Sequence, residues 1–133
     1  MAEQELQELC KRKRDQIVLL MEVSNLTREM QVAADRRDEV SLNMLLSMRE
    51  APLHQLQELE EGIQNYLLTL PEDDASLYHD LLLGIEEAEE PEEEPLCEQV
   101  AKYRRLLESV IEMDKRMSLR LGGNQSFYKK FRE

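Results

Sequence analysis

An apolar residue recurs at every third or fourth position along residues 96–121, and this spacing limits what the chain can fold into. Positions three and four apart share one face of an α-helix, so the pattern predicts an amphipathic helix over about residues 95–121. Pro95 suits the first helical position, and Gly122-Gly123 is typical of a helix end. Asp114 alone interrupts the stripe. Its apolar members are Leu96, Val100, Tyr103, Leu107, Val110, Met117 and Leu121.

Two further stripes predict long helices over about residues 3–34 and 39–70. The stripes differ in phase and a charged run separates them, so we place a turn there, with Asp38 as N-cap of the second helix. Pro52 should kink that helix, because it removes one backbone hydrogen bond. The alternative is a first helix that runs through to Ala51 and breaks at Pro52. The stripes consist of Leu19, Val23, Leu26, Met30 and Ala33, and of Leu42, Leu45, Leu56, Leu59, Ile63, Tyr66 and Leu70.

The segments after Pro71 are shorter. We expect a third helix over about residues 74–86, capped by Asp73 or Asp74. Seven glutamates follow within nine residues, and they leave too little apolar surface to offset the entropy of ordering, so residues 86–95 should be a solvated, mobile linker. The tail, residues 122–133, is basic and aromatic. It could dock on the bundle, anchor a partner or touch a membrane weakly.

Together these elements predict an all-α protein with a single domain over residues 1–133. The expected architecture is an antiparallel helical hairpin or bundle of three to four helices with coiled-coil-like packing. Helix-forming residues dominate the composition, with only 4 Gly and no Trp. No run reaches the roughly 20 apolar residues that span a bilayer. The N-terminus, Met1-Ala2-Glu3-Gln4-Glu5, is acidic, so we expect a cytoplasmic protein without stable membrane insertion.

Residue types that build catalytic and metal sites are scarce. Cys10, Cys97, His54 and His79 do not have the spacing of metal ligands, and the two thiols are expected to be reduced and to serve as small apolar groups. No glycine-rich phosphate loop or HExxH motif occurs. Residues 50–95 hold 15 Asp and Glu but no Lys or Arg, and such a block repels nucleic-acid phosphates. We therefore expect no enzyme activity, no cofactor or metal ion and no nucleic-acid partner.

The border of the last stripe is the candidate partner-binding surface. Some apolar residues there widen or flank the stripe, and on a helix that follows a solvated linker they could exchange an internal contact for a foreign one. The tail adds three aromatic residues, which provide a large contact area for a small loss of side-chain freedom. The predicted partner-binding residues are Leu106, Ile111, Met113, Met117, Phe127, Tyr128 and Phe131.

Residues 35–59 combine an acidic turn, spaced leucines and an Arg-Glu pair. These residues are Asp35 or Asp38, Leu42, Leu45, Leu46, Arg49, Glu50, Leu53 and Leu56. The segment resembles the helical turn of flagellar type III export chaperones of the FlgN/FliT type, in which a long first helix turns at an acidic residue. Residues 111–131 would then correspond to the substrate-binding C-terminal helix of that family. The resemblance covers about half of the chain, and the acidic linker and Pro52 depart from the family pattern.

The resemblance implies a non-enzymatic cytoplasmic chaperone. Such a protein would bind helical terminal segments of late flagellar substrates, hook-associated or filament-type, until they are secreted. The alternative is a self-associating coiled-coil protein with a structural or adaptor role, for which a homodimer is the simplest form. A chaperone should keep apolar surface available for a foreign helix, whereas an adaptor should cover that surface in a symmetric oligomer.

Overall fold

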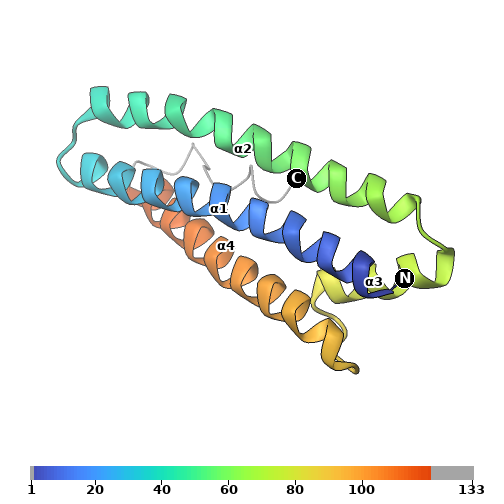
Figure 1. Cartoon of the computed structure of the whole chain (residues 1–133). Coiled ribbons are helices and arrows are strands. Elements are labelled where there is room, and N and C mark those ends of the chain that lie inside the picture. Colours follow the sequence, from blue (N-terminus) through green and yellow to red (C-terminus); the bar gives the residue numbers. More distant parts are fainter. Residues whose placement is uncertain (1, 121–133) are drawn as a thin grey trace.

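The computed structural model describes residues 2–120, and these residues form a bundle of helices without a strand (Figure 1). The all-α fold class predicted from the sequence is confirmed. Predictions for the tail at residues 122–133, including Phe127, Tyr128 and Phe131, lie outside the described residues. The elements are α1 (Ala2–Asp35), α2 (Glu39–Leu68), α3 (Glu72–Leu83), a single 3-10 turn η1 (Pro91–Glu93) and α4 (Glu94–Arg120).

The turn between α1 and α2 lies where the charged run predicted it. Asp38 is the N-cap of α2, and its carboxylate accepts hydrogen bonds from the Ser41 backbone N–H at 3.1 Å and from the Ser41 hydroxyl at 2.6 Å. Arg37, with a φ of 56°, provides the left-handed residue that reverses the chain. Pro52 lies inside the continuous helix α2, so the alternative of one helix ending at Ala51 is wrong.

The α3 region differs from its prediction at both ends. Helix α3 begins at Glu72 after Pro71 and has no side-chain cap, so Asp73 and Asp74 are first-turn acids that favour the positive end of the helix dipole rather than caps. It ends three residues before the predicted position, because Gly84 adopts a left-handed φ of 73°. The predicted linker also contains η1, where Glu93 is buried and its carboxylate accepts a hydrogen bond from the Glu89 N–H at 3.2 Å.

Helix α1 lies between α2 and α4 and packs against both (Figure 1). Helix α2 runs antiparallel to α1, as expected for a hairpin. Helix α4 runs parallel to α1, because α3 and the linker carry the chain across the end of the hairpin before α4 begins. Among the described helices, none is long and apolar enough to cross a membrane.

The core consists of three apolar clusters arranged along the bundle. The first lies at the α3 end and joins Leu6 and Leu9 to Ile63, Tyr78 and Leu96. A central cluster joins Leu20 and Val23 to Leu56, Val110 and Met113. The third lies at the end with the α1–α2 turn and joins Leu26 and Met30 to Leu42, Leu45 and Met117. Polar residues separate these clusters.

Candidate functional site

A buried ion pair links α2 to α4 between the central cluster and the cluster at the α1–α2 turn. Arg49 Nη1 lies 2.8 Å from Asp114 Oδ1, and both side chains are almost completely excluded from solvent. The same Nη1 donates to the Thr27 hydroxyl at 2.9 Å, and that hydroxyl donates to the Val23 carbonyl at 2.7 Å. We call Thr27, Arg49 and Asp114 the arginine layer. It connects all three long helices at one height of the bundle.

A second set of polar residues separates the central cluster from the cluster at the α3 end. Lys13 is buried, with its Nζ 4.0 Å from the centroid of the Tyr103 ring, and Gln16 donates to Glu60 at 3.1 Å. Burial lowers the pKa of Lys13, whereas the nearby charge of Glu60 opposes that shift. Burial and, to a smaller extent, Glu60 raise the pKa of Tyr103 to about 12. We call these four residues the lysine layer.

The two layers are suited to positioning helices. A buried charge without its partner is costly, so each layer favours the one register in which its groups meet. Arg49 and Asp114 have little exposure to a dissolved substrate, and among residues 2–120 no group of His, Cys, Asp and Glu could hold a metal ion. His54 is exposed and lies 2.9 Å from Glu58 one helical turn away.

Burial divides the described members of the predicted partner-binding set. Leu106 and Ile111 are half-buried on α4, as a border position requires. Met113 and Met117 are 8% and 2% exposed and belong to the core clusters. The interpretation of Met113 as a border residue is therefore wrong, because the buried face of α4 is wider than the stripe alone.

Helices α2 and α4 meet only through side chains. Within the described residues, no Cα atom of α2 lies within 8 Å of one in α4, although both helices pack on α1. Glu60 marks the flank of α2 that faces α4, since it influences Tyr103, and Leu46 and Leu53 precede it at seven-residue spacing on that flank. We call the half-buried residues along this opening the α2–α4 border: Leu46, Leu53, Tyr103, Leu107 and Ile111. Leu106 lies five positions before Ile111, about 140° around α4, and shares with Gln99 and Met117 the flank of that helix that faces α1.

The arginine layer is the feature that sequence reasoning missed, although the stripes contained a signal for it. Asp114 interrupts the stripe of α4, and Arg49 stands at a position where the seven-residue repeat of α2 calls for an apolar residue. Taken alone, each charged residue could be an exposed position that interrupts an apolar stripe. Two opposite charges, each on the buried face of its own helix, indicate a buried pair.

Comparison with known proteins identifies no relative. No protein-family model matches the chain, and no curated protein or solved structure matches it either. Functional interpretation of this bundle therefore depends on its own surfaces.

Proposed function

We propose that the protein binds a helical segment of another protein along the α2–α4 border. The observation that carries the proposal is the row of five half-buried apolar side chains on two helices whose backbones remain apart. A half-buried apolar side chain gains free energy when it is covered, at about 25 cal/mol for each Å² removed from water. An amphipathic helix with apolar residues at i, i+3, i+4 and i+7 has the shape to cover the row.

The export chaperone that the sequence resembles is the specific form of this proposal. A cytoplasmic location and helical terminal segments of hook-associated or filament-type substrates as partners belong to it. Support comes from the half-buried state of Ile111, which lies on the helix that would correspond to the substrate-binding one. The arginine layer supports it as well, because a buried pair that holds α4 in register keeps the border in one shape.

Binding should depend on the border and not on the buried methionines. We expect Ile111→Asp and Leu53→Asp each to weaken capture of fluorescently labelled C-terminal segments of such substrates at least tenfold, because a carboxylate would be desolvated under the bound helix. Fluorescence anisotropy measures the affinity, and circular dichroism verifies that each variant stays helical. Val18→Asp is the matched control, since Val18 is 67% exposed on α1 outside the border.

Two other outcomes point away from this proposal. Equal affinity in the wild type and in both border variants would move the binding surface elsewhere. Truncation after Leu121 then tests the tail residues Phe127, Tyr128 and Phe131. If the wild type captures none of these segments and sediments as a symmetric oligomer, the adaptor alternative is correct.

A further inference from the structure

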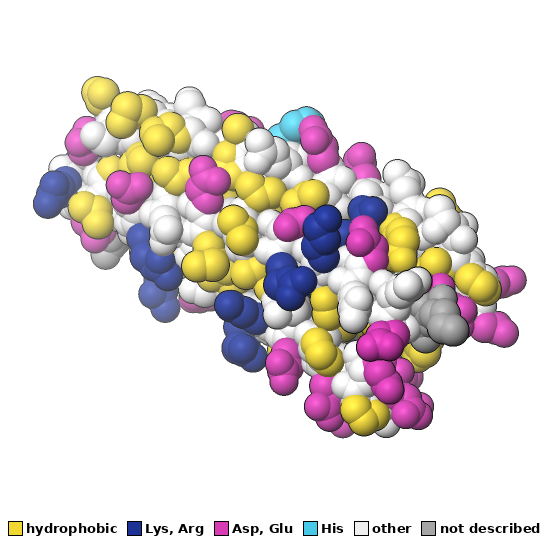
Figure 2. All heavy atoms as spheres, in the orientation of Figure 1, with side chains coloured by type: hydrophobic (Ala, Val, Ile, Leu, Met, Phe, Trp, Pro, Cys, Tyr) yellow, Lys and Arg dark blue, Asp and Glu magenta, His cyan; other side chains and the backbone are white. Residues whose placement is uncertain are grey.

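The N-terminal half of α2 carries a second apolar stripe that the core does not use. Val40, Met44 and Met48 follow one another at four-residue spacing and are 82%, 57% and 52% exposed. Exposed Ala51 continues the same face. At 100° per residue this face lies roughly 120° around the helix from the core stripe, so the bundle does not cover it. Figure 2 shows apolar side chains gathered at this end of the molecule.

The stripe also lies in an uncharged run of a highly charged chain. Residues 40–48 contain no Asp, Glu, Lys or Arg, although 35% of the whole chain is charged. Residues 50–95, which contain acids but no Lys or Arg, begin two residues later. They continue through the rest of α2, α3 and the linker to the opposite end of the bundle (Figures 1 and 2). Glu39 and Glu50 flank this run, but no acid lies within it, so a molecule that itself carries a net charge of −12 can approach here more closely than at the acid-rich end.

We propose that this stripe, Val40, Met44 and Met48, is a docking surface for a second copy of the chain, arranged antiparallel about a two-fold axis near Met44. In that arrangement Val40 of one copy packs against Met48 of the other, and Met44 meets its own counterpart, as a two-fold interface requires. The two acidic α3 ends then point in opposite directions. A parallel arrangement would bring them side by side, and their repulsion would oppose it.

The proposed interface is small, so the dimer should be weak. Three large side chains on each copy bury much less than the roughly 1,600 Å² of a standard stable interface. Methionine side chains suit such a contact, because they are flexible and adapt to a similar surface. The expected association is in the micromolar-to-millimolar range, and it should strengthen as added salt screens the repulsion between two chains of net charge −12.

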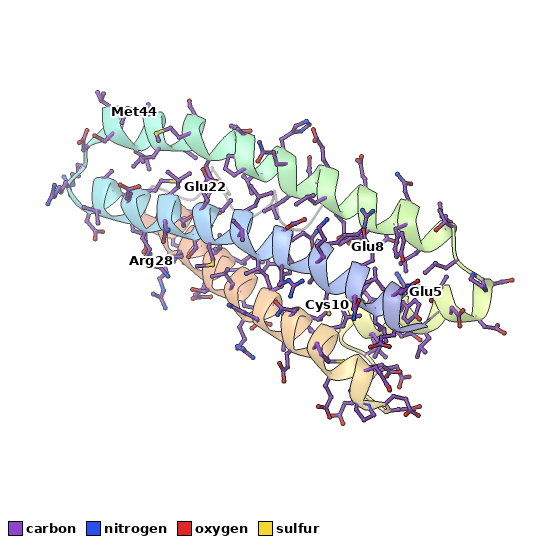
Figure 3. All side chains as sticks on the ribbon, viewed as in Figure 1. Glu5, Glu8, Cys10, Glu22, Arg28 and Met44 are labelled. Carbon is purple, nitrogen blue, oxygen red and sulfur yellow. The ribbon has the colours of Figure 1, made fainter. Side chains whose placement is uncertain are left out.

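Two experiments on the full chain test the proposal. In sedimentation velocity over a concentration series up to about 1 mM, the wild type should shift towards a dimer. Met44→Asp should raise the dissociation constant at least tenfold, because two added carboxylates would face each other. Leu68→Asp should leave it unchanged, since Leu68 is 83% exposed at the far end of α2 and adds the same charge. Met44 is labelled in Figure 3.

Cross-linking tests the two-fold axis directly. In a Cys10→Ala/Cys97→Ala background, Met44→Cys protein incubated with oxidised glutathione should form a disulfide-linked dimer, and Leu68→Cys protein should not. A wild type that stays monomeric throughout, or equal cross-linking of the two variants, would overturn the proposal. If Met44→Asp instead abolishes capture of a helical peptide by a monomeric protein, a foreign helix occupies the stripe. The border variants distinguish that result from failure of the proposed function.

Discussion

Arg49 and Asp114 determine how the helices of this bundle align. Apolar residues tolerate small shifts of one helix along another, because one leucine can replace the next in the same space. A guanidinium and a carboxylate 2.8 Å apart in a dry core tolerate no such shift. The pair therefore contributes to a unique register even where its net contribution to the free energy of unfolding is small, since the cost of desolvating both charges offsets their attraction.

Removal of one charge should therefore cost more than removal of both. We expect Asp114→Ala to lower the free energy of unfolding by about 3–5 kcal/mol, because Arg49 stays buried without its carboxylate. Arg49→Met/Asp114→Leu should recover most of that loss, since neither side chain of the former pair is then charged. Urea denaturation followed by circular dichroism gives both values. Equal losses in the single and double variants would mean that the pair contributes through packing and not through charge.

Tyr103 makes the stability depend on alkaline pH. Its pKa in the folded protein is raised to about 12, first by burial and then by Glu60, whereas an unfolded tyrosine titrates near 10. Below pH 10 the phenol is neutral in both states. Above it the unfolded state loses its proton first, so this contribution to stability is lost as the pH rises towards about 12.

The Tyr103→Phe variant isolates this effect. Urea midpoints measured from pH 9 to 12 should fall less steeply in the variant than in the wild type. Lys13 Nζ lies 4.0 Å from the centroid of the Tyr103 ring, and Phe keeps a ring at that place, so the burial that lowers the pKa of Lys13 is common to both proteins. Parallel curves would show that Tyr103 ionises as readily in the folded chain as in the unfolded one.

The existence of the helices could be read from the sequence, whereas their ends depended on single residues. Apolar spacing alone predicted all four helices, because a core-facing stripe is a property of each helix by itself. The end of α3 was missed because the apolar Ile85 continues the stripe and so predicted a longer helix. The left-handed Gly84 ends the helix before Ile85 is reached. The start of α3 was missed because the chain turns at Pro71 without a side-chain cap.

Two glycines, one at a helix end and one inside a helix, test whether a helix end needs a glycine for its left-handed backbone. Gly84→Ala should destabilise the protein by about 1–2 kcal/mol, because its left-handed φ disfavours a Cβ. The added Cβ would also collide with the guanidinium of Arg104, which donates to the Leu83 carbonyl at 3.2 Å and joins α4 to the end of α3.

Gly62→Ala should have the opposite sign. Gly62 lies within α2, where alanine is favoured by up to about 1 kcal/mol. Its added Cβ would meet Arg12 Nη1 at 3.2 Å, and the end of that long side chain can move aside. Thermal melts of the two variants should therefore shift in opposite directions, and a shared direction would contradict this account.

The arrangement of the whole molecule was less predictable than its parts. Apolar periodicity has no direction, so the stripe on α4 did not show that the helix runs parallel to α1. That direction follows from α3 and the linker, which return the chain to the end where it started. The partners of polar core residues were also hidden, because Arg49 and Asp114 lie 65 positions apart and neither charge identifies the other without the fold. The α2–α4 border is a property of three helices together and has no signature in any one of them.

The same separation has a consequence for a chain that is still being synthesised. The α1–α2 hairpin is synthesised before α4, so Arg49 exists before both the carboxylate that pairs with it and the helix that helps to bury it. We therefore expect the side of the α1–α2 hairpin around Arg49 to stay open to water in a growing chain until α4 packs against it. A product that ends before Asp114 never receives the missing charge. We expect such incomplete copies to be cut by proteases faster than the full chain.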